Sequence, residues 1–433
     1  METGYKKPST LSIGARLKNN GKLLTVLNLS SVTFLVMLGL SMVAPILPGY
    51  AESFQVSYAM VGLVISSFAV TRMVLDIPAG FLGRKYDKKA IMILGLLLIV
   101  VSSIIAGFAT TYPLLIIARM IEGAGSALYV TTATIFLAQI TGSKKRGQLM
   151  SVYSGMLLLG SIFGPTFGGA LATAFDIRAP FFAYAVVAGF GVIPTLILPK
   201  MPNSGHTSTL EDRKPVLRDV WSVLTYPSFF LATIATFTLF FIRTGVRSTL
   251  VPLFAANNLG LSADIIGILL TFAALATAST MVPMGSLSDR IGRRNPLIAA
   301  LLFSAIVTLW IPFSTNLLSL SICMVAYGAG VGLSGPIAAY ITDVSPQDKL
   351  EISMGLYRMI SDFGFIAGPL LLGFLADLSV ASTSGNGSAT GPIGLLPFIV
   401  GAIIMILAGL TLLMADDPVR KQNRTSQITV GNQ

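Results

Sequence analysis

Two long apolar runs flank the short basic segment Gly285-Ser286-Leu287-Ser288-Asp289-Arg290-Ile291-Gly292-Arg293-Arg294. A segment of the same kind lies 205 residues earlier, at Gly80-Phe81-Leu82-Gly83-Arg84-Lys85-Tyr86-Asp87-Lys88-Lys89. Both segments begin with glycine and end in two basic residues. Two copies of one loop predict two copies of one fold within the chain.

The second segment has the pattern G-x-x-x-D-R-x-G-R-R, which resembles the signature loop of the major facilitator superfamily of membrane transporters. In that family the loop joins the second and third helices of each six-helix half. The resemblance therefore implies an all-α membrane protein with twelve transmembrane helices in two pseudo-symmetric six-helix bundles, arranged around a central cavity.

The composition agrees with a membrane protein. Of the 433 residues, 54% are hydrophobic and 11% are charged, whereas soluble proteins are about a quarter charged. A membrane-spanning helix needs about 20 apolar residues, and twelve runs meet that length. They cover residues 23–48, 58–82, 90–110, 113–140, 148–173, 180–199, 222–252, 264–287, 296–314, 317–342, 352–376 and 392–414.

The distribution of basic residues predicts the orientation in the membrane. With both termini in the cytoplasm, the cytoplasmic segments hold 23 of the 29 lysines and arginines, five more lie within spans, and the external loops hold only Arg178. This is the bias of the positive-inside rule. It explains the net charge of +11 without a nucleic-acid partner, and it predicts a multi-pass protein of the cell membrane.

The polar segments predict the domain limits. The longest internal polar stretch, residues 200–220, contains prolines, a glycine and mixed charges, as a linker does. We therefore expect a cytoplasmic N-terminal segment, two six-helix bundles separated by a cytoplasmic linker, and a cytoplasmic tail. Their predicted limits are residues 1–22, 23–199, 200–220, 221–414 and 415–433.

The internal repeat extends beyond the two basic segments. At an offset of 204 or 205 residues, glycines and prolines recur in order over four of the six helices of each half; the pairs include Gly62 with Gly267, Gly160 with Gly364, Gly164-Pro165 with Gly368-Pro369, and Gly169 with Gly373. A repeat of this length between two membrane halves is typical of secondary transporters.

The fifth predicted span carries small residues at regular spacing. Gly160, Gly164 and Gly168 recur every four residues, with Pro165 and Gly169 beside them. This spacing lets two helix backbones approach closely. The pattern resembles a motif of proton-coupled antiporters of the superfamily, although Ser151 stands where the full motif has its first glycine. Helix packing alone is the alternative, and Gly368-Pro369 repeats the pattern in the second half.

The fourth predicted span carries Arg119 and Glu122, three residues apart and therefore on one helix face. The segment looks like the R-x-x-Q-G-x-G element of the family, whose arginine is associated with proton coupling, with glutamate replacing glutamine. Because charges in a membrane are costly, we favour a functional role over a self-neutralised structural pair.

Other charges in the spans also suggest pairs. Arg72 with Asp76, and Arg358 with Asp362, have i, i+4 spacing. We predict Asp362 as a protonatable carboxylate of the central pathway, and the Arg72–Asp76 pair as a structural gate.

The seventh predicted span carries Arg243 and Arg247 with no acid. An unpaired arginine cluster can bind an anionic group, or it can extend to the membrane surface. For Arg247 we favour the surface. The predicted site thus comprises Arg119, Glu122, Asp362 and Arg243.

The basic segments predict conformational latches. In the family, an acid of the first segment contacts the start of helix 11, but here Arg84 takes that position and Asp87 takes that of a glycine. We therefore expect Arg84 or Lys85 to pair with Asp348 or Glu351, and Asp289 to approach Arg146 and Gly147. The predicted latch residues are Arg72, Asp76, Gly80, Arg84, Lys85, Gly285, Asp289, Arg290, Gly292, Arg293 and Arg358.

The predicted function is that of a secondary active transporter, not an enzyme: proton-coupled export of small organic or amphiphilic molecules by alternating access. The chain has no nucleotide-binding G-x4-G-K-[ST] loop, and its single histidine and single cysteine argue against a metal site. We predict no cofactor, and a monomer whose partners are a small-molecule substrate, protons and lipid. Two alternatives stay open: uptake or exchange of an organic anion with Arg243 and Arg119 as ligands, and a membrane sensor without transport.

Overall fold

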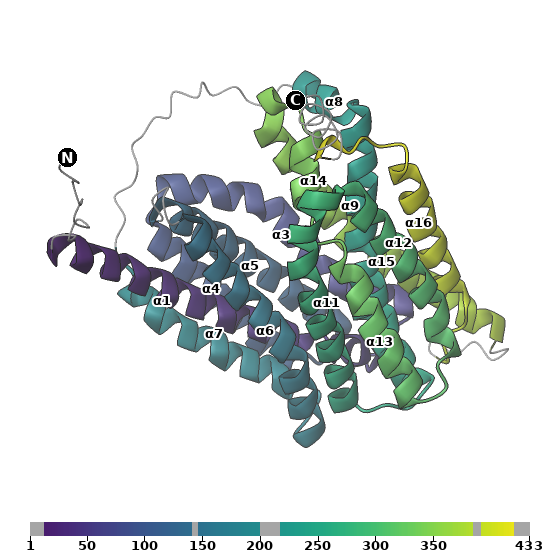
Figure 1. Ribbon diagram of the computed structural model, residues 1–433. Helices are drawn as coiled ribbons and strands as arrows, with labels where there is room; N and C mark the ends of the chain where they lie inside the picture. The colour runs from purple at the N-terminus through teal and green to yellow at the C-terminus, as the bar shows by residue number, and fades with distance from the viewer. Residues whose placement is uncertain (1–12, 141–145, 200–216, 384–390, 420–433) are drawn as a thin grey trace, which may run out of the picture.

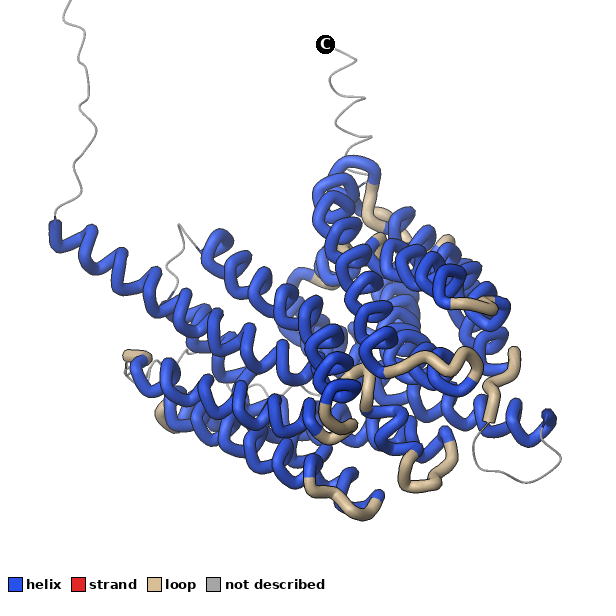
Figure 2. The backbone as a smooth tube through the Cα atoms, turned by 90° about the horizontal axis from the view of Figure 1, so that it is seen from below, coloured by secondary structure: helices blue, strands red, loops and turns tan. Residues whose placement is uncertain are grey.

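The computed structural model describes residues 13–140, 146–199, 217–383 and 391–419. Every regular element among them is helical, and short loops join the helices (Figure 2). The first half contains α1 (Ile13–Val43), α2 (Leu47–Glu52), α3 (Tyr58–Lys85), α4 (Lys88–Gly107), α5 (Tyr112–Ile140), α6 (Arg146–Ala174) and α7 (Ala179–Ile197). The second half contains α8 (Leu217–Leu224), α9 (Pro227–Gly245), the π-helical turn η1 (Val246–Leu250), α10 (Val251–Asn257), α11 (Ala263–Ile291), α12 (Arg294–Trp310), η2 (Ile311–Phe313), α13 (Leu317–Gly332), α14 (Ile337–Val344), η3 (Gln347–Lys349), α15 (Leu350–Thr383) and α16 (Leu396–Leu412).

The predicted membrane spans are confirmed. Among the described residues, eleven helical segments are long and apolar enough to cross a bilayer, and the shorter apolar α16 provides the twelfth. Two spans are less regular than the sequence predicted. The seventh runs through α9, η1 and α10 by way of the π turn, and the tenth is interrupted between α13 and α14 at residues 333–336.

The helices form two groups, which Figure 1 shows in purple through blue to teal for α1–α7 and in teal-green to yellow for α8–α16. In the first group, α1 packs on α6 and α7, and α5 packs on α3 and α4. In the second, α9 packs on α15, and α12 packs on α13 and α16. The two groups meet mainly through α3 against α15 and through α6 against α11.

These two interfaces repeat the same close packing. A Cβ added to Gly62 would overlap the carbonyl oxygen of Pro369, and one added to Gly267 would overlap that of Pro165. Gly373 and Gly169 contact the first turns of α3 and α11 equally closely. All four glycines have counterparts in the internal repeat, so the repeat builds two equivalent seams where backbones touch. We call this end of the molecule, which holds the first turns of α3 and α11, the sealed end.

The opposite ends of α3 and α11 are not packed in this way. Gly80 and Gly285 have no atom within 4 Å of where a Cβ would stand. Near them, Ile77 is 69% exposed and Val282 is 72% exposed. The two halves are therefore joined tightly at the sealed end, and Gly80 and Gly285, the first glycines of the two basic segments, lie free of such contacts at the other end.

We expect Gly62→Ala to lower the apparent melting temperature of the protein in lipid nanodiscs. The added methyl group meets helix backbone, and overpacking of this kind costs about 1–3 kcal/mol. Gly80→Ala is the matched control, because its methyl group enters open space and alanine favours a helix by about 1 kcal/mol. Equal melting temperatures for the two variants would contradict the seam.

Candidate functional site

A cavity of about 710 Å³ lies between the two groups of helices. Side chains from α1, α3, α5, α6, α9, η1, α11 and α15 line it. Its charged lining residues are Arg72, Asp76, Arg119, Arg243, Arg247, Arg358 and Asp362. The cavity thus gathers nearly all the charges that the sequence places within the spans, and Glu122 is buried next to Arg119.

Two ion pairs cross from one half to the other in this cavity. Arg72 on α3 pairs with Asp362 on α15, and Asp76 Oδ2 lies 3.1 Å from Arg358 Nη2. Thr131 Oγ donates a hydrogen bond of 2.8 Å to the other oxygen of Asp76. The pairing along each helix that the sequence predicted is therefore wrong.

The geometry of the two helices explains this correction. Helices α3 and α15 pack antiparallel, with Tyr58 at the start of α3 bonded to Asp377 near the end of α15. Along such a pair, residue numbers increase on one helix while they decrease on the helix that faces it. Two R-x-x-x-D segments then face each other in opposite order, and each arginine meets the acid of its neighbour.

The arginines on the first-half side of the cavity share an aromatic ring. The Cζ atom of Arg72 lies 5.5 Å from the ring centre of Phe68 and 5.2 Å from that of Phe365. Arg119 Cζ lies 5.0 Å from the centre of the same Phe68 ring, a distance at which cation and ring attract. Phe68 therefore lies between Arg119, the arginine predicted for proton coupling, and Arg72, the arginine predicted for a structural gate.

Arg119 and Glu122 form the ion pair that their spacing predicted. Both side chains are buried, with 5% and 2% of their surfaces exposed. Glu122 Oε1 and Arg119 Nε have no hydrogen-bond partner within the described chain. The pair is neutral as a whole but incompletely satisfied, so it retains the capacity to accept a further proton or polar group.

Arg243 and Arg247 line the cavity from α9 and the π turn. The sequence suggested that the side chain of Arg247 extends to the membrane surface, and the structure shows that it does not. Its Nη2 instead donates a hydrogen bond of 3.2 Å to the carbonyl oxygen of Leu270 on α11. The π turn, in which Thr249 Oγ bonds the carbonyl of Thr244 five residues back, changes the direction of the side chains that follow Gly245. Such turns are frequent at functional sites.

The glycine motif of the fifth span lies against α1. Backbone atoms of Phe34, Leu38 and Met42 contact Gly160, Gly164 and Gly168, respectively. Gly169 faces α11, and in the second half Gly368 faces Phe241 and Gly245 of α9. The segment from α1 to the start of α2 also borders the cavity, with the apolar residues Met37, Leu40, Val43, Ala44 and Leu47 and one polar residue, Ser41.

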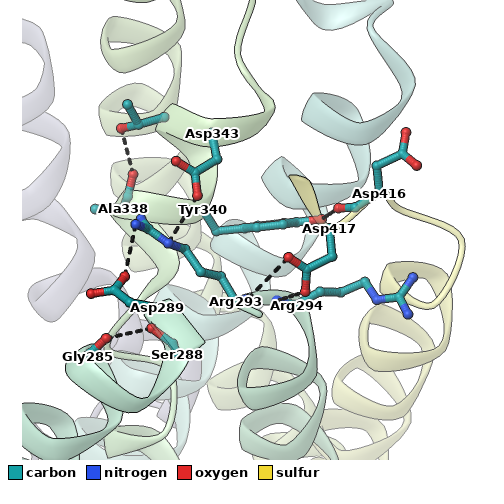
Figure 3. A network of polar contacts seen from close by, with 11 residues as sticks. Gly285, Ser288, Asp289, Arg293, Arg294, Ala338, Tyr340, Asp343, Asp416 and Asp417 are labelled. Atoms are coloured by element: carbon teal, nitrogen blue, oxygen red, sulfur yellow. Dashed lines mark hydrogen bonds and ion pairs between the residues drawn. The ribbon is translucent and has the colours of Figure 1, made fainter. Parts of the chain in front are cut away.

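The second basic segment holds α12 and α14 together (Figure 3). Arg293 lies between two acids, with Nη2 3.0 Å from Asp289 and Nε 3.0 Å from Asp343. Asp289 therefore pairs within its own segment. Its predicted neighbours Arg146 and Gly147 are described only as part of the α6 backbone, and the side chains of Arg84, Lys85 and Glu351 likewise lie outside what the structure describes. The latch pairings of both segments therefore stay predictions.

The two basic segments cap the following helix in different ways. Asp87 accepts a hydrogen bond of 3.1 Å from the backbone N–H of Lys89 at the start of α4. The equivalent residue of the second half, Gly292, has a φ of 95°, and Asp417 supplies the carboxylate instead, accepting from the backbone of Arg293 and Arg294 at 3.4 and 3.2 Å. This explains why aspartate stands at position 87, where the family pattern has glycine. Asp87 caps α4 from within its own segment, whereas α12 is capped by Asp417, which follows α16.

The sealed end carries polar bonds between the halves that the sequence did not predict. Asp377 accepts hydrogen bonds from the backbone N–H groups of Tyr58 and Ala59, at 2.6 and 2.9 Å. Asn257 Nδ2 donates to both carboxylate oxygens of Glu52 at 3.1 Å and to the Tyr58 hydroxyl at 2.9 Å. Burial raises the pKa of Glu52 above its usual range, and the Asn257 bond opposes this only in part.

We expect the interaction energy between opposite charges on α3 and α15 to exceed that between opposite charges on the same helix. In double-mutant cycles of thermal stability, Asp76→Asn and Arg358→Gln should show an interaction energy within the ~0.5–3 kcal/mol that contacting residues give. Arg358 is half exposed, so solvent screening places the value at the lower end. Asp76→Asn with Arg72→Gln, the pair along α3, is the control. A larger interaction energy in the control would contradict the observed pairing.

We expect the sealed end to open more readily as the pH rises. The raised pKa of Glu52 means that its protonated form is favoured while it is buried. The sealed conformation therefore gains stability as the pH falls through that pKa and loses it as the pH rises. The measurement is alkylation of a cysteine at the cavity residue Ser41, in a Cys323→Ser background, by an impermeant maleimide applied to the sealed end between pH 5 and pH 8.

The alkylation rate should rise with pH beyond the change expected from the thiol itself. Glu52→Gln should remove this additional rise, whereas Asp176→Asn, a change in the loop before α7, should leave it intact. Identical profiles of alkylation rate against pH with glutamate and with glutamine at position 52 would exclude Glu52 as the source of the pH dependence.

Comparisons with known proteins agree with this architecture. A family model described as Major Facilitator Superfamily matches residues 29–255 and 232–429. The chain is 25% identical to Multidrug resistance protein 2 of Bacillus subtilis (strain 168), over 84% of this chain and 91% of that protein. It is also 25% identical to Quinolone resistance protein NorA of Staphylococcus aureus (strain COL), over 80% of this chain and 88% of that protein.

Solved structures share the fold at low sequence identity. A bacterial homologue of the human lysosomal transporter Spinster, in an inward-facing and unoccupied conformation, superposes with a TM-score of 0.73 at 16% identity, over 91% of this chain and 95% of the other. The nucleoside transporter NupG superposes with a TM-score of 0.74 at 13% identity, over 90% and 98%.

Proposed function

Because this chain belongs to the Major Facilitator Superfamily and is a membrane transporter, we propose that it exports small organic molecules in exchange for protons. The two helix groups, over residues 23–199 and 221–414, act as the units that rock against each other in alternating access. Both termini lie in the cytoplasm, the sealed end faces outward, and the protein works as a monomer in the cell membrane.

The observation that carries the proton-coupling proposal is the ion pair between Arg72 and Asp362 across the two halves. Asp362 lines the cavity, and its side chain is only 8% exposed. Protonation neutralises the carboxylate and leaves Arg72 without its counter-charge. The attraction between α3 and α15 then weakens, so the protonation state of one residue is linked to the relative position of the two halves.

The names of the relatives support the direction of transport. Multidrug and quinolone resistance proteins are named for resistance to toxic compounds, which export produces. The sealed end agrees with this proposal: with that end outward, the cavity faces the cytoplasm, from which an exporter takes its substrate. Arg119 and Glu122, joined to Arg72 through Phe68, are the second candidate pair for proton transfer.

We expect Asp362→Asn to abolish substrate-driven proton movement in proteoliposomes containing a pH-sensitive dye. The asparagine retains the size of the side chain but can neither release nor accept the coupled proton. Glu122→Gln should slow the movement, and Asp176→Asn should leave it at the wild-type rate. Undiminished proton movement in Asp362→Asn would remove Asp362 from the mechanism.

One observation favours an anionic substrate, the second candidate that the sequence raised. Within the described chain, the side chain of Arg243 makes no hydrogen bond or ion pair, yet it lines the cavity and is exposed there. The excess of arginines over carboxylates in the cavity also favours an anionic substrate.

A further inference from the structure

We infer that the cavity binds an amphiphilic monoanion, an apolar molecule with one oxyanion group, and that Arg243 is the residue that binds this group. The inference rests on the proposed transport function, because it names the substrate class of the same cavity. It follows from three features of the lining: the balance of charges, the state of Arg243, and the apolar wall opposite.

The charges of the cavity do not balance. Five arginines belong to it, and three carboxylates lie in it or directly behind it. Each carboxylate is already paired with one arginine: Asp362 with Arg72, Asp76 with Arg358, and Glu122 with Arg119. Arg243 and Arg247 are the arginines left over, so the cavity carries two positive charges in excess.

The two remaining arginines differ in their contacts. Arg247 donates to the carbonyl of Leu270, a neutral partner that leaves its charge uncompensated. The guanidinium of Arg243 has neither a hydrogen bond nor an ion pair among the described residues, and the side chain is open to the cavity. An unpaired charge in a membrane protein is costly and is typically functional. A guanidinium can bind an oxyanion through two parallel hydrogen bonds, so a bound anion would supply the missing counter-charge.

The rest of the lining fits an apolar body. The wall formed by α1 has no charged residue between Met37 and Leu47. Phe240, Leu270 and Phe365 add further apolar surface. The volume of about 710 Å³ is within the range of drug-sized ligand sites, about 300–1,000 Å³. The site thus combines an excess of positive charge, in which the Arg243 side chain is the one without a protein partner among the described residues, with a broad apolar surface.

A lipophilic cation would fit this cavity poorly. Every carboxylate of the cavity is already paired with an arginine, so none is available to bind the cation. The two uncompensated positive charges would repel it. Repulsion of this kind is an effective means of specificity. A monoanion, in contrast, would also be driven outward by the interior-negative potential of a cell membrane, which agrees with the proposed direction of transport.

The test uses two probes with the same apolar body and opposite charge, 1-pyrenebutyrate and 1-pyrenebutyl-trimethylammonium. The saturable part of probe binding is measured by fluorescence on the full chain in lipid nanodiscs, with empty nanodiscs as the blank. We expect the carboxylate to bind at least tenfold more tightly than the ammonium compound. Equal affinities, or tighter binding of the ammonium compound, would overturn the inference without the need for any variant.

Three variants then test the role of Arg243. Arg243→Gln should lower the affinity for pyrenebutyrate at least tenfold and reduce the preference for the anion. Arg243→Lys should keep a preference for the anion with weaker binding, because the charge remains and the bidentate geometry is lost. Arg178→Gln, which removes a positive charge far from the cavity, should bind like the unmodified chain. A full anion preference in folded Arg243→Gln would overturn the assignment to this residue.

The binding assay needs no proton gradient, so it separates this inference from the proposed function. Anion preference without substrate-driven proton movement would contradict proton-coupled export alone. Proton-coupled export of the ammonium probe, without binding of the carboxylate, would contradict the substrate class alone.

Discussion

A charge within a membrane needs a partner, and this protein pairs four of the seven charged residues that line its cavity across the boundary between its two halves. Arg72 with Asp362, and Asp76 with Arg358, join α3 to α15. The same two helices meet backbone to backbone at Gly62 and Pro369. Charge pairing and close packing therefore act on one interface. Any change in the charge of its carboxylates acts directly on the arrangement of the halves, which is what a coupled transporter requires.

The internal repeat makes the packing symmetric but leaves the chemistry asymmetric. The α6–α11 interface repeats the glycine contacts of the α3–α15 interface. Its central contact, however, is a hydrogen bond of 2.8 Å between the hydroxyl groups of Thr166 and Thr271. The α3–α15 interface thus carries ion pairs, whereas the described α6–α11 interface carries hydroxyl hydrogen bonds, including one of 3.0 Å from Thr173 to Asp264. In the proposed mechanism, this asymmetry keeps two equivalent contacts between the halves and confines the response to protons to one of them.

The arginines that remain outside these pairs give the cavity its character. Similar proteins named for multidrug or quinolone resistance share about a quarter of the residues, and this level of similarity establishes family and fold more firmly than substrate. The substrate class depends on a few lining residues. In this chain the wall from Met37 to Leu47 is uncharged and mostly apolar, the carboxylates are paired with arginines, and the side chain of Arg243 has no protein partner among the described residues.

The sequence by itself determined the membrane spans, the internal repeat and the set of charges placed within the spans. Hydropathy and repeated motifs are local properties that can be read along the chain. It also predicted the Arg119–Glu122 pair, because two side chains three residues apart on one helix lie on the same face.

Only the tertiary structure decided which of the other charges meet. That choice depends on the antiparallel register of α3 and α15, which pairs Arg72 with Asp362 rather than with Asp76. It decided the direction of Arg247 through a π turn, and it brought Asp417 to the start of α12 more than a hundred residues away. Each of these depends on contacts between segments far apart in the chain, and patterns within one segment contain no information about the register of another.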